Sequence, residues 1–331
     1  MIYLNNDAKY PVTMYLRNVL MGAALAAQQG TTNIMCNIAA AFGTIAGWTL
    51  SDGMMYHADT NSWVFEPTTD RWKQMLEYTN KLYSAGVLDE EFATLDSNVY
   101  VQRIVQGKTF MMIDWIQNLS TYIPQGKAID PDFELSVIYP PKGTDDNHAL
   151  GWASAWSLAI CLSSKLKDDP EHLQDVLSYL DWGYTDEAEV LLNFGVEGED
   201  FVKDSDGVMH GKDPNVNYSA TAGLGSNDFV IRESIDKITG FLSKEDRDLV
   251  AQIAQDNIVP MPNPTAPLSI EQLEETKVYS ATLSDYVKSM MEKFIMGKEP
   301  LSNWDSFVQG CKEKGSTRLE EAYRTAMENK D

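Results

Sequence analysis

The stretch Gly107-Lys-Thr-Phe-Met-Met-Ile-Asp-Trp115 decides how this chain is interpreted. Its first residues favour a turn, and the apolar run Thr109–Ile113 predicts a buried strand. Trp115 then follows at the point where the strand ends. Strand ends in α/β proteins border ligand crevices, and an indole ring offers a flat face to a ring-shaped ligand. The stretch therefore predicts a binding site that begins at Trp115.

Helices and strands are predicted in alternation on both sides of this stretch. A helix is expected to open at Pro67-Thr-Thr-Asp70 and a second one covers 98–105, both before the strand. Further strands are predicted at 135–139 and 156–161, joined through the stiff segment Pro140-Pro-Lys-Gly143. Strands separated by helices predict an α/β fold with mainly parallel sheets. The proline segment suits a chain that crosses from one lobe to another.

Turn-forming residues predict two hairpins, at 55–65 and at 201–209. The stretch 257–268 contains four prolines and predicts an extended loop. Beyond it the chain is expected to be helical to its end. There, Ser302 with Asp305 and Thr317 with Glu320 match the spacing of capping boxes.

An apolar stripe and a cap predict two more helices. The residues of the stripe recur at helical spacing, and they are Leu173, Val176, Leu177 and Leu180. Thr185-Asp186 is expected to cap the next helix, which ends at Gly195.

The composition indicates an ordered protein that avoids polyanions. The chain has 331 residues, of which 44% are hydrophobic, enough for two lobes with well-buried cores. Its formal net charge is −23, which would repel nucleic acid and an anionic membrane surface. An acidic chain with 10% aromatic residues suits neutral ligands such as sugars. No nucleic-acid partner is expected.

The cysteines and histidines do not predict a metal or a cofactor. Cys36, Cys161 and Cys311 are far apart in the sequence, and core packing is the expected role of each. The four histidines show no metal-ligand spacing among themselves or with the cysteines.

Several segments match part of a known phosphate-binding, calcium-binding or catalytic motif. Gly107-Lys-Thr109 resembles the end of a phosphate loop, but Gln102 stands where its first glycine is needed and a strand follows. The stretch 200–207 resembles a calcium loop, but Val202 breaks the alternation of oxygen-bearing side chains. Glu197 and Glu199 are a conceivable acid and base pair of a glycosidase, whose separation the sequence does not give. A glycoside hydrolase or another carbohydrate-active enzyme is therefore the alternative function.

Three tryptophans are the candidate ligand-binding residues. Trp115, Trp152 and Trp156 cluster at the ends or starts of predicted strands, where no helical periodicity explains them. Asp114 and Asn118 supply carboxylate and amide groups next to Trp115. Sugar pockets combine ring stacking with such hydrogen-bonding groups. Packing in the core stays open as the alternative role for each ring.

The other tryptophans have different expected roles. Trp72 and Trp304 fall on apolar helix stripes and are expected in the core, and Trp63 is expected to pack within its hairpin. Trp182, near a helix end, suits either role.

From about Asn33 to its end, the chain resembles an extracellular solute-binding protein of a carbohydrate ABC transporter, in the lipoprotein-type branch of family 1. Besides Gly107–Trp115, the segments that carry this resemblance are Phe65–Tyr78, Lys81–Phe92, Trp156–Lys165, Asn193–Phe201 and Lys293–Asp305. The resemblance implies a periplasmic-binding-protein-like (type II) fold, in which two α/β lobes joined by a hinge close on a sugar. It also implies a monomer without catalytic activity or cofactor, which stacks Trp115 on the sugar and delivers it to a membrane permease.

Two departures from this family shape the expected domains and location. Members usually begin with a signal peptide, a lipidated cysteine that anchors them outside the cell, and a long first-lobe segment. None of these is recognised here, so one lobe is expected to be incomplete. Residues 1–20 resemble the tail of the partner permease, and a permease fragment is a third hypothesis because no charge lies between Arg17 and Asp52.

The expected domains follow from this comparison. Residues 1–32 form an atypical N-terminal segment, and 33–139 form the first part of the second, C-terminal lobe. Residues 140–190 are a remnant of the first lobe, and 191–331 return mainly to the second lobe.

Overall fold

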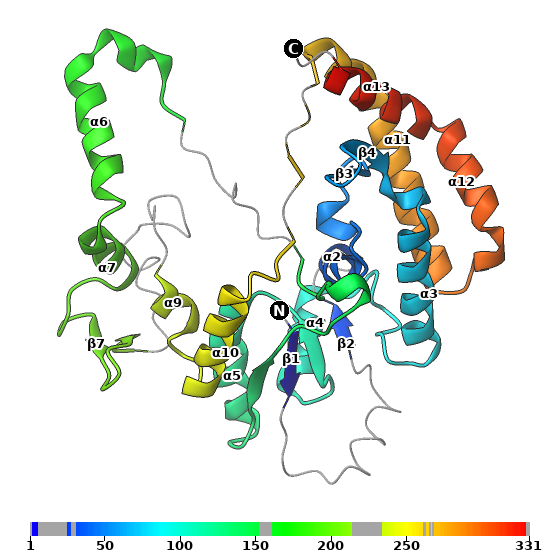
Figure 1. Cartoon of the computed structure of the whole chain (residues 1–331). Helices are drawn as coiled ribbons and strands as arrows, with labels where there is room; N and C mark the ends of the chain where they lie inside the picture. The colour runs from blue at the N-terminus through cyan, green and yellow to red at the C-terminus, as the bar shows by residue number, and fades with distance from the viewer. Residues whose placement is uncertain are drawn as a thin grey trace. The chain divides into compact units, whose positions relative to one another are not determined.

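The computed structural model describes residues 2–5, 25–27, 31–151, 161–213, 234–260, 263–264, 266 and 268–328. The chain divides into two compact units (Figure 1). Unit 1 comprises Met1–Trp115, Thr121–Ser154 and Gln252–Asp331, and unit 2 comprises Ile116–Ser120 and Ala155–Ala251. Trp115 is thus the residue at which the chain first leaves unit 1.

A four-stranded sheet lies in unit 1. Its strands are β1 (Ile2–Asn5), β2 (Leu25–Ala27), β5 (Met111–Ile113) and β6 (Leu135–Ile138), in the order β2-β5-β1-β6. β2 pairs parallel to β5, whereas β1 pairs antiparallel to both β5 and β6. Two of the three pairings in this sheet are therefore antiparallel, and the prediction of mainly parallel sheets is wrong. The reason is that β1, from the segment 1–32, lies between β5 and β6 and runs in the opposite direction. The strands predicted at 109–113 and 135–139 are confirmed with shorter bounds.

Seven helices of the described chain lie mainly or entirely in unit 1. They are α2 (Thr31–Ala41), α3 (Asp70–Ser84), α4 (Ser97–Val105), α5 (Leu119–Ile129), α11 (Ile270–Ile295), α12 (Trp304–Glu313) and α13 (Ser316–Glu328). Helix α11 packs against α3, α12 and α13 (Figure 1). The ring of Trp72 stacks on Phe307 at 5.8 Å, and Trp304 lies beside both. The core role predicted for these two tryptophans is confirmed.

The helix ends confirm some of the predicted signals. The Thr69 hydroxyl accepts a hydrogen bond from the Trp72 main-chain N–H, and α3 begins at the next residue, Asp70. Gly86, with φ +68°, lies just after its end. Helix α11 begins with a capping box between Ser269 and Gln272.

Both capping boxes predicted near the C-terminus are wrong. Helix α12 begins at Trp304 because a 3₁₀ turn, η6 (Leu301–Asn303), already contains Ser302. Helix α13 begins at Ser316, so Thr317 lies inside its first turn and not before it.

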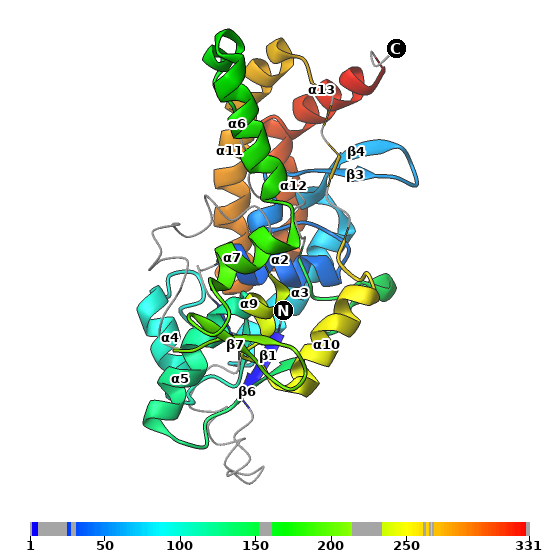
Figure 2. The same ribbon diagram turned by 90° about the vertical axis from the view of Figure 1, so that its left-hand side faces the viewer.

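A hairpin formed by β3 (Met54–His57) and β4 (Ser62–Phe65) stands at the edge of unit 1 (Figure 2). Asn61 adopts φ +49° in its turn, a conformation that Asn tolerates better than most residues. Strand β4 packs against α13. The predicted hairpin is confirmed.

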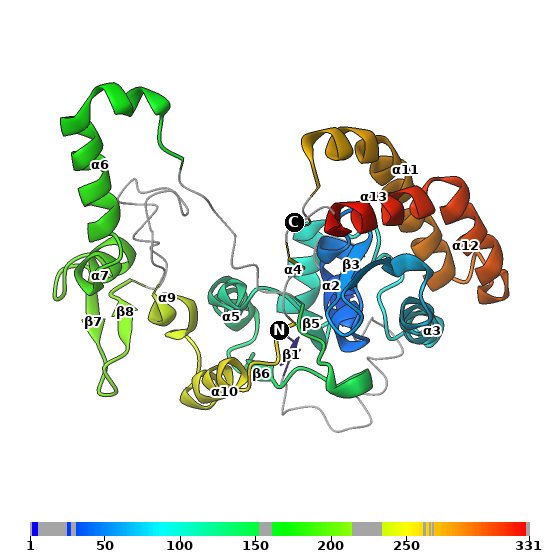
Figure 3. The same cartoon turned by 45° about the horizontal axis from the view of Figure 1, so that its top comes forward.

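Unit 2 contains helices, 3₁₀ turns and a hairpin of two short strands (Figure 3). Those described are η3 (Ile116–Asn118), η5 (Ser164–Asp168), α6 (Pro170–Trp182), α7 (Asp186–Phe194), β7 (Phe201–Lys203), β8 (Met209–Gly211), α9 (Ile235–Thr239) and most of α10 (Lys244–Gln255). The predicted cap of α7 is confirmed, because Thr185 Oγ1 accepts from the Ala188 N–H. The β7–β8 hairpin is confirmed as well.

Helix α6 has the predicted periodicity, yet none of its residues is buried. The strand predicted at 156–161 falls almost entirely outside the described residues, and Cys161, which is described, is not in a strand. The remaining short turns are η1 (Gly47–Thr49), η2 (Glu66–Thr68) and η4 (Thr144–Asp146). Among the described helices, none has the length and apolar character needed to cross a bilayer.

The three cysteines differ in their burial. Cys36 and Cys311 are buried, which confirms their predicted core role. The same prediction is wrong for Cys161, which is exposed on a stretch without regular structure ahead of η5.

Candidate functional site

Trp115 lies two residues beyond the end of β5, and its side chain is 54% exposed. It is therefore not part of the buried core of unit 1. The preceding residue, Asp114, is 4% exposed. The end of β5 thus carries a buried carboxylate and an exposed indole on adjacent residues.

The Asp114 carboxylate is held by groups from three parts of unit 1. Its Oδ2 atom accepts hydrogen bonds from the hydroxyls of Tyr100, at 3.0 Å, and Tyr122, at 2.8 Å. Its Oδ1 atom accepts from the main-chain N–H of Trp115, at 2.7 Å. A buried carboxylate is costly unless such donors replace water. These bonds make its burial possible.

The two tyrosines come from the helices on either side of β5 in the sequence. Tyr100 belongs to α4 and is fully buried, and Tyr122 belongs to α5 and is 4% exposed. Their rings lie 6.4 Å apart in an edge-to-face arrangement. Neither tyrosine was among the residues predicted for the site. The available signal was general: a buried Tyr needs a partner for its hydroxyl, and Asp114 was the acidic residue next to the predicted strand.

Of the other three predicted site residues, the structure describes only Asn118. Asn118 is half-buried at the end of η3, which belongs to unit 2 and contacts α9. Trp152 and Trp156 lie outside the described residues. Trp182, whose role was left open, ends α6 half-buried, with its ring 5.8 Å from that of Tyr179.

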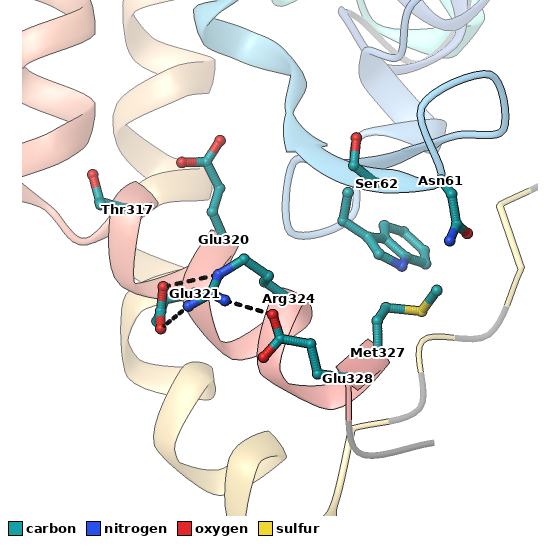
Figure 4. A pocket seen from close by; sticks show the side chains of 9 residues that line it. Asn61, Ser62, Thr317, Glu320, Glu321, Arg324, Met327 and Glu328 are labelled. Carbon is teal, nitrogen blue, oxygen red and sulfur yellow. Dashed lines mark hydrogen bonds and ion pairs between the residues drawn. The ribbon is translucent and has the colours of Figure 1, made fainter. Parts of the chain in front are cut away.

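A separate pocket of about 460 Å³ lies between the β3–β4 hairpin and α13 (Figure 4). None of the predicted site residues lines it. Its lining residues are Asn61, Ser62, Trp63, Thr317, Glu320, Glu321, Arg324, Met327 and Glu328. Arg324 is bonded to both Glu321 and Glu328 (Figure 4), so its charge is already compensated.

Trp63 is the aromatic residue of this pocket. Its ring packs edge-on against Tyr323 at 4.9 Å, in keeping with its predicted packing role. Its indole Nε1 atom is buried and has no hydrogen-bond partner in the described chain.

The acidic pair considered for glycosidase chemistry is exposed. Glu197 forms an ion pair with Lys203 at 3.2 Å, in the connection between α7 and β7, and Glu199 is exposed beside it. Within the described ranges, no group of three or more His, Cys, Asp or Glu residues is arranged to hold a metal ion.

Comparison by sequence finds distant relatives. No family model matches the chain. It is 21% identical over 271 residues to lipoprotein LipO of Bacillus subtilis (strain 168), a match that covers 80% of this chain. The chain spans only 52% of the length of LipO.

Comparison by structure finds solute-binding proteins. The alginate-binding protein AlgQ2 superposes with a TM-score of 0.69 and 15% identity, over 99% of this chain and 71% of AlgQ2. The ABC-transporter substrate-binding protein FusA of S. pneumoniae, in complex with kestose, gives 0.60 and 15%, over 100% of this chain and 72% of FusA. The N-glycan transport solute-binding protein NgtS of Streptococcus pneumoniae gives 0.59 and 12%, over 100% and 73%. The chain therefore has the α/β, periplasmic-binding-protein-like fold that the sequence predicted, and the resemblance to carbohydrate solute-binding proteins is confirmed.

Proposed function

We propose that this chain is the substrate-binding component of an ABC importer that takes up a sugar or oligosaccharide. It binds the ligand by aromatic stacking and hydrogen bonds and delivers it unchanged to a membrane permease. The observation that carries the proposal is the likeness to AlgQ2, FusA and NgtS over nearly the whole chain, since these proteins are described as binding or transporting saccharides.

Trp115 is the residue we propose as the stacking platform. Its indole is more than half exposed, and it follows a strand of the sheet directly after a rigidly held carboxylate. Apolar faces of sugar rings pack on such aromatic surfaces. Asn118, Trp152 and Trp156 remain proposed ligand-binding residues in the same function.

The partners and the location are part of the same proposal. A carbohydrate and the permease subunits of an ABC transporter are the partners, and the chain acts as a monomer. We place it outside the cell membrane, since LipO is a lipoprotein. In domain terms, residues 33–139 and most of 191–331 are proposed as the second lobe, 140–190 as part of the first lobe, and 1–32 as an atypical segment.

The enzyme alternative is weaker. It rested on Glu197 and Glu199, but one of them is paired with Lys203, and both are exposed next to the β7–β8 hairpin. The proteins to which the fold is similar are named as binding or transport proteins. Release of free sugar from an aryl glycoside, lost on changing Glu197 to Gln, would revive the enzyme hypothesis.

A ligand titration tests the proposal. The purified chain is titrated with kestose, alginate oligosaccharides and N-glycan-derived oligosaccharides while intrinsic tryptophan fluorescence and binding heat are followed. A saturable response with at least one class, with intact sugar recovered afterwards, is the expected result. A lack of response to every class, in a sample that unfolds cooperatively, would overturn the proposal for this chain.

A further inference from the structure

Trp115 has an exposed side chain but a fixed main chain. Its N–H donates to Asp114 Oδ1 at 2.7 Å, and the 3₁₀ turn η3 begins at the next residue. On the other side, Asp114 follows the last residue of β5, Ile113, which is 2% exposed. The backbone that carries the indole is thus restrained both before and after it.

The restraint on Asp114 itself comes from two helices. Tyr100 of α4 and Tyr122 of α5 both donate to Oδ2, so this single oxygen joins two helices to the end of β5. With Oδ1 bonded to Trp115, both oxygens of the carboxylate are engaged inside the protein. Asp114 is therefore poorly placed to accept a hydrogen bond from a sugar hydroxyl, the role that its position next to Trp115 first suggested.

We infer that Asp114, Tyr100 and Tyr122 form a positioning triad, which holds Trp115 in the orientation needed for stacking without touching the ligand. Binding groups supported by a hydrogen-bonded shell lose less freedom when the ligand arrives. The statement that Trp115 stacks on a ligand rests on the proposed function. The coupling between the triad and the indole is a property of the free protein.

Fluorine NMR of protein labelled with 5-fluorotryptophan reads this coupling directly. The chain has eight tryptophans, and the resonance of Trp115 is identified as the one missing from Trp115→Phe. In Asp114→Asn, which keeps the shape of the side chain but removes its charge, the Trp115 resonance is expected to shift or broaden. The resonances of the buried Trp72 and Trp304 are expected to stay in place. Affinity for the saccharide found by titration is expected to fall about tenfold.

Asp89 supplies a matched control. It is 2% exposed, lies in unit 1, and is paired with Arg103, so Asp89→Asn also disturbs a buried carboxylate. This variant is expected to unfold more readily while leaving the Trp115 resonance and the affinity unchanged. If it moves the Trp115 resonance as strongly as Asp114→Asn does, general destabilisation explains the effect and the triad is overturned.

Tyr122→Phe and Tyr100→Phe test the positioning triad even if Asp114→Asn does not fold. Each removes one hydroxyl and retains the ring, and each is expected to move the Trp115 resonance in the direction of Asp114→Asn by a smaller amount. An unchanged Trp115 resonance in all three variants overturns the triad.

Lost binding with an unchanged Trp115 resonance also overturns the triad, because Asp114 would then contact the ligand itself. If the wild-type chain binds no saccharide, the NMR result still decides the positioning role, so the two failures are distinct.

Discussion

His57 Nε2 lies 2.5 Å from Glu66 Oε1, and the Glu66 side chain is completely buried. The other oxygen of this carboxylate accepts from the Thr44 hydroxyl at 2.5 Å and from the Thr69 hydroxyl at 3.3 Å. Glu66 therefore joins the end of β3 to the loop after α2 and to the start of α3. A single buried carboxylate thus connects three successive segments of the chain.

Replacing Glu66 by Ala is expected to lower the free energy of unfolding by about 3 kcal/mol, because buried donors lose their acceptor. Urea unfolding followed by circular dichroism measures the change. Glu77→Ala, an exposed change on α3, is the control and should stay within about 0.5 kcal/mol of wild type. Equal midpoints for the two variants would contradict the structural role of Glu66.

Gly143 should not tolerate a side chain. A Cβ atom at this position would lie 1.9 Å from the main-chain oxygen of Ala41, at the end of α2. Gly143→Ala is therefore expected to cost at least about 2 kcal/mol, since backbone must shift to remove the overlap. Gly86→Ala is the matched control: its φ is +68° but nothing lies within 4 Å of the added atom. That variant should cost about 1 kcal/mol from backbone conformation alone, and the reverse order of the two would count against the packing described here.

The thiols should react in an order set by burial. Cys161 is exposed, whereas Cys311 is fully buried and its burial raises the pKa of the thiol to about 12. The thiolate is the reactive form, so at pH 8 a disulfide reagent should modify Cys161 rapidly and Cys311 only as the protein unfolds. Cys161→Ser should remove the rapid phase. A rapid phase that survives in this variant would show that a buried thiol is accessible.

The same shift predicts a loss of stability at alkaline pH. In the unfolded chain Cys311 releases its proton near the ordinary pKa of 9.0, while the folded protein retains it up to about 12. The folded state therefore binds more protons between these values, and stability falls as pH rises through this window. Measured by urea unfolding from pH 8.5 to 10.5, the decline should be shallower in Cys311→Ala than in wild type. A parallel decline would mean that other groups, not Cys311, are responsible.

Substitutions of two tryptophans of unit 1 distinguish ligand binding at the proposed sugar site from binding in the pocket beside α13. Trp115→Ala is expected to raise the dissociation constant for the bound saccharide about tenfold or more, which corresponds to about 1.4 kcal/mol of lost stacking energy. Trp63→Phe alters the other pocket and keeps an aromatic ring there. Calorimetry on both variants decides the location: loss of affinity in the Trp63 variant alone would move the sugar site to the hairpin and α13.

Local signals in the sequence predicted the local structure well. The hairpin predicted at 55–65 forms as β3–β4, and Thr69 and Thr185 both cap the helices expected after them. The prediction of a capping box failed where the expected cap residue belongs to a neighbouring turn. Ser302 has the right spacing for a capping box, but η6 includes it, so the helix starts two residues later.

Contacts between segments that are distant in the chain could not be predicted from the sequence. The position of Trp115 at a strand end followed from the apolar run before it, yet Tyr100 and Tyr122 meet Asp114 only through the packing of α4 and α5. The incomplete burial of the apolar stripe of α6 was not predicted for the same reason. Helical spacing shows that apolar residues share a face, but only tertiary structure shows what packs on that face.

Strand β1 has a practical consequence for anyone who produces this protein. Ile2–Asn5 occupies an interior position of the sheet, between β5 and β6, and is the only strand of the described chain that pairs with β6. A shortened version that lacks Ile2–Asn5 would lose the strand that joins β5 to β6, and among the described strands β6 would have no paired neighbour.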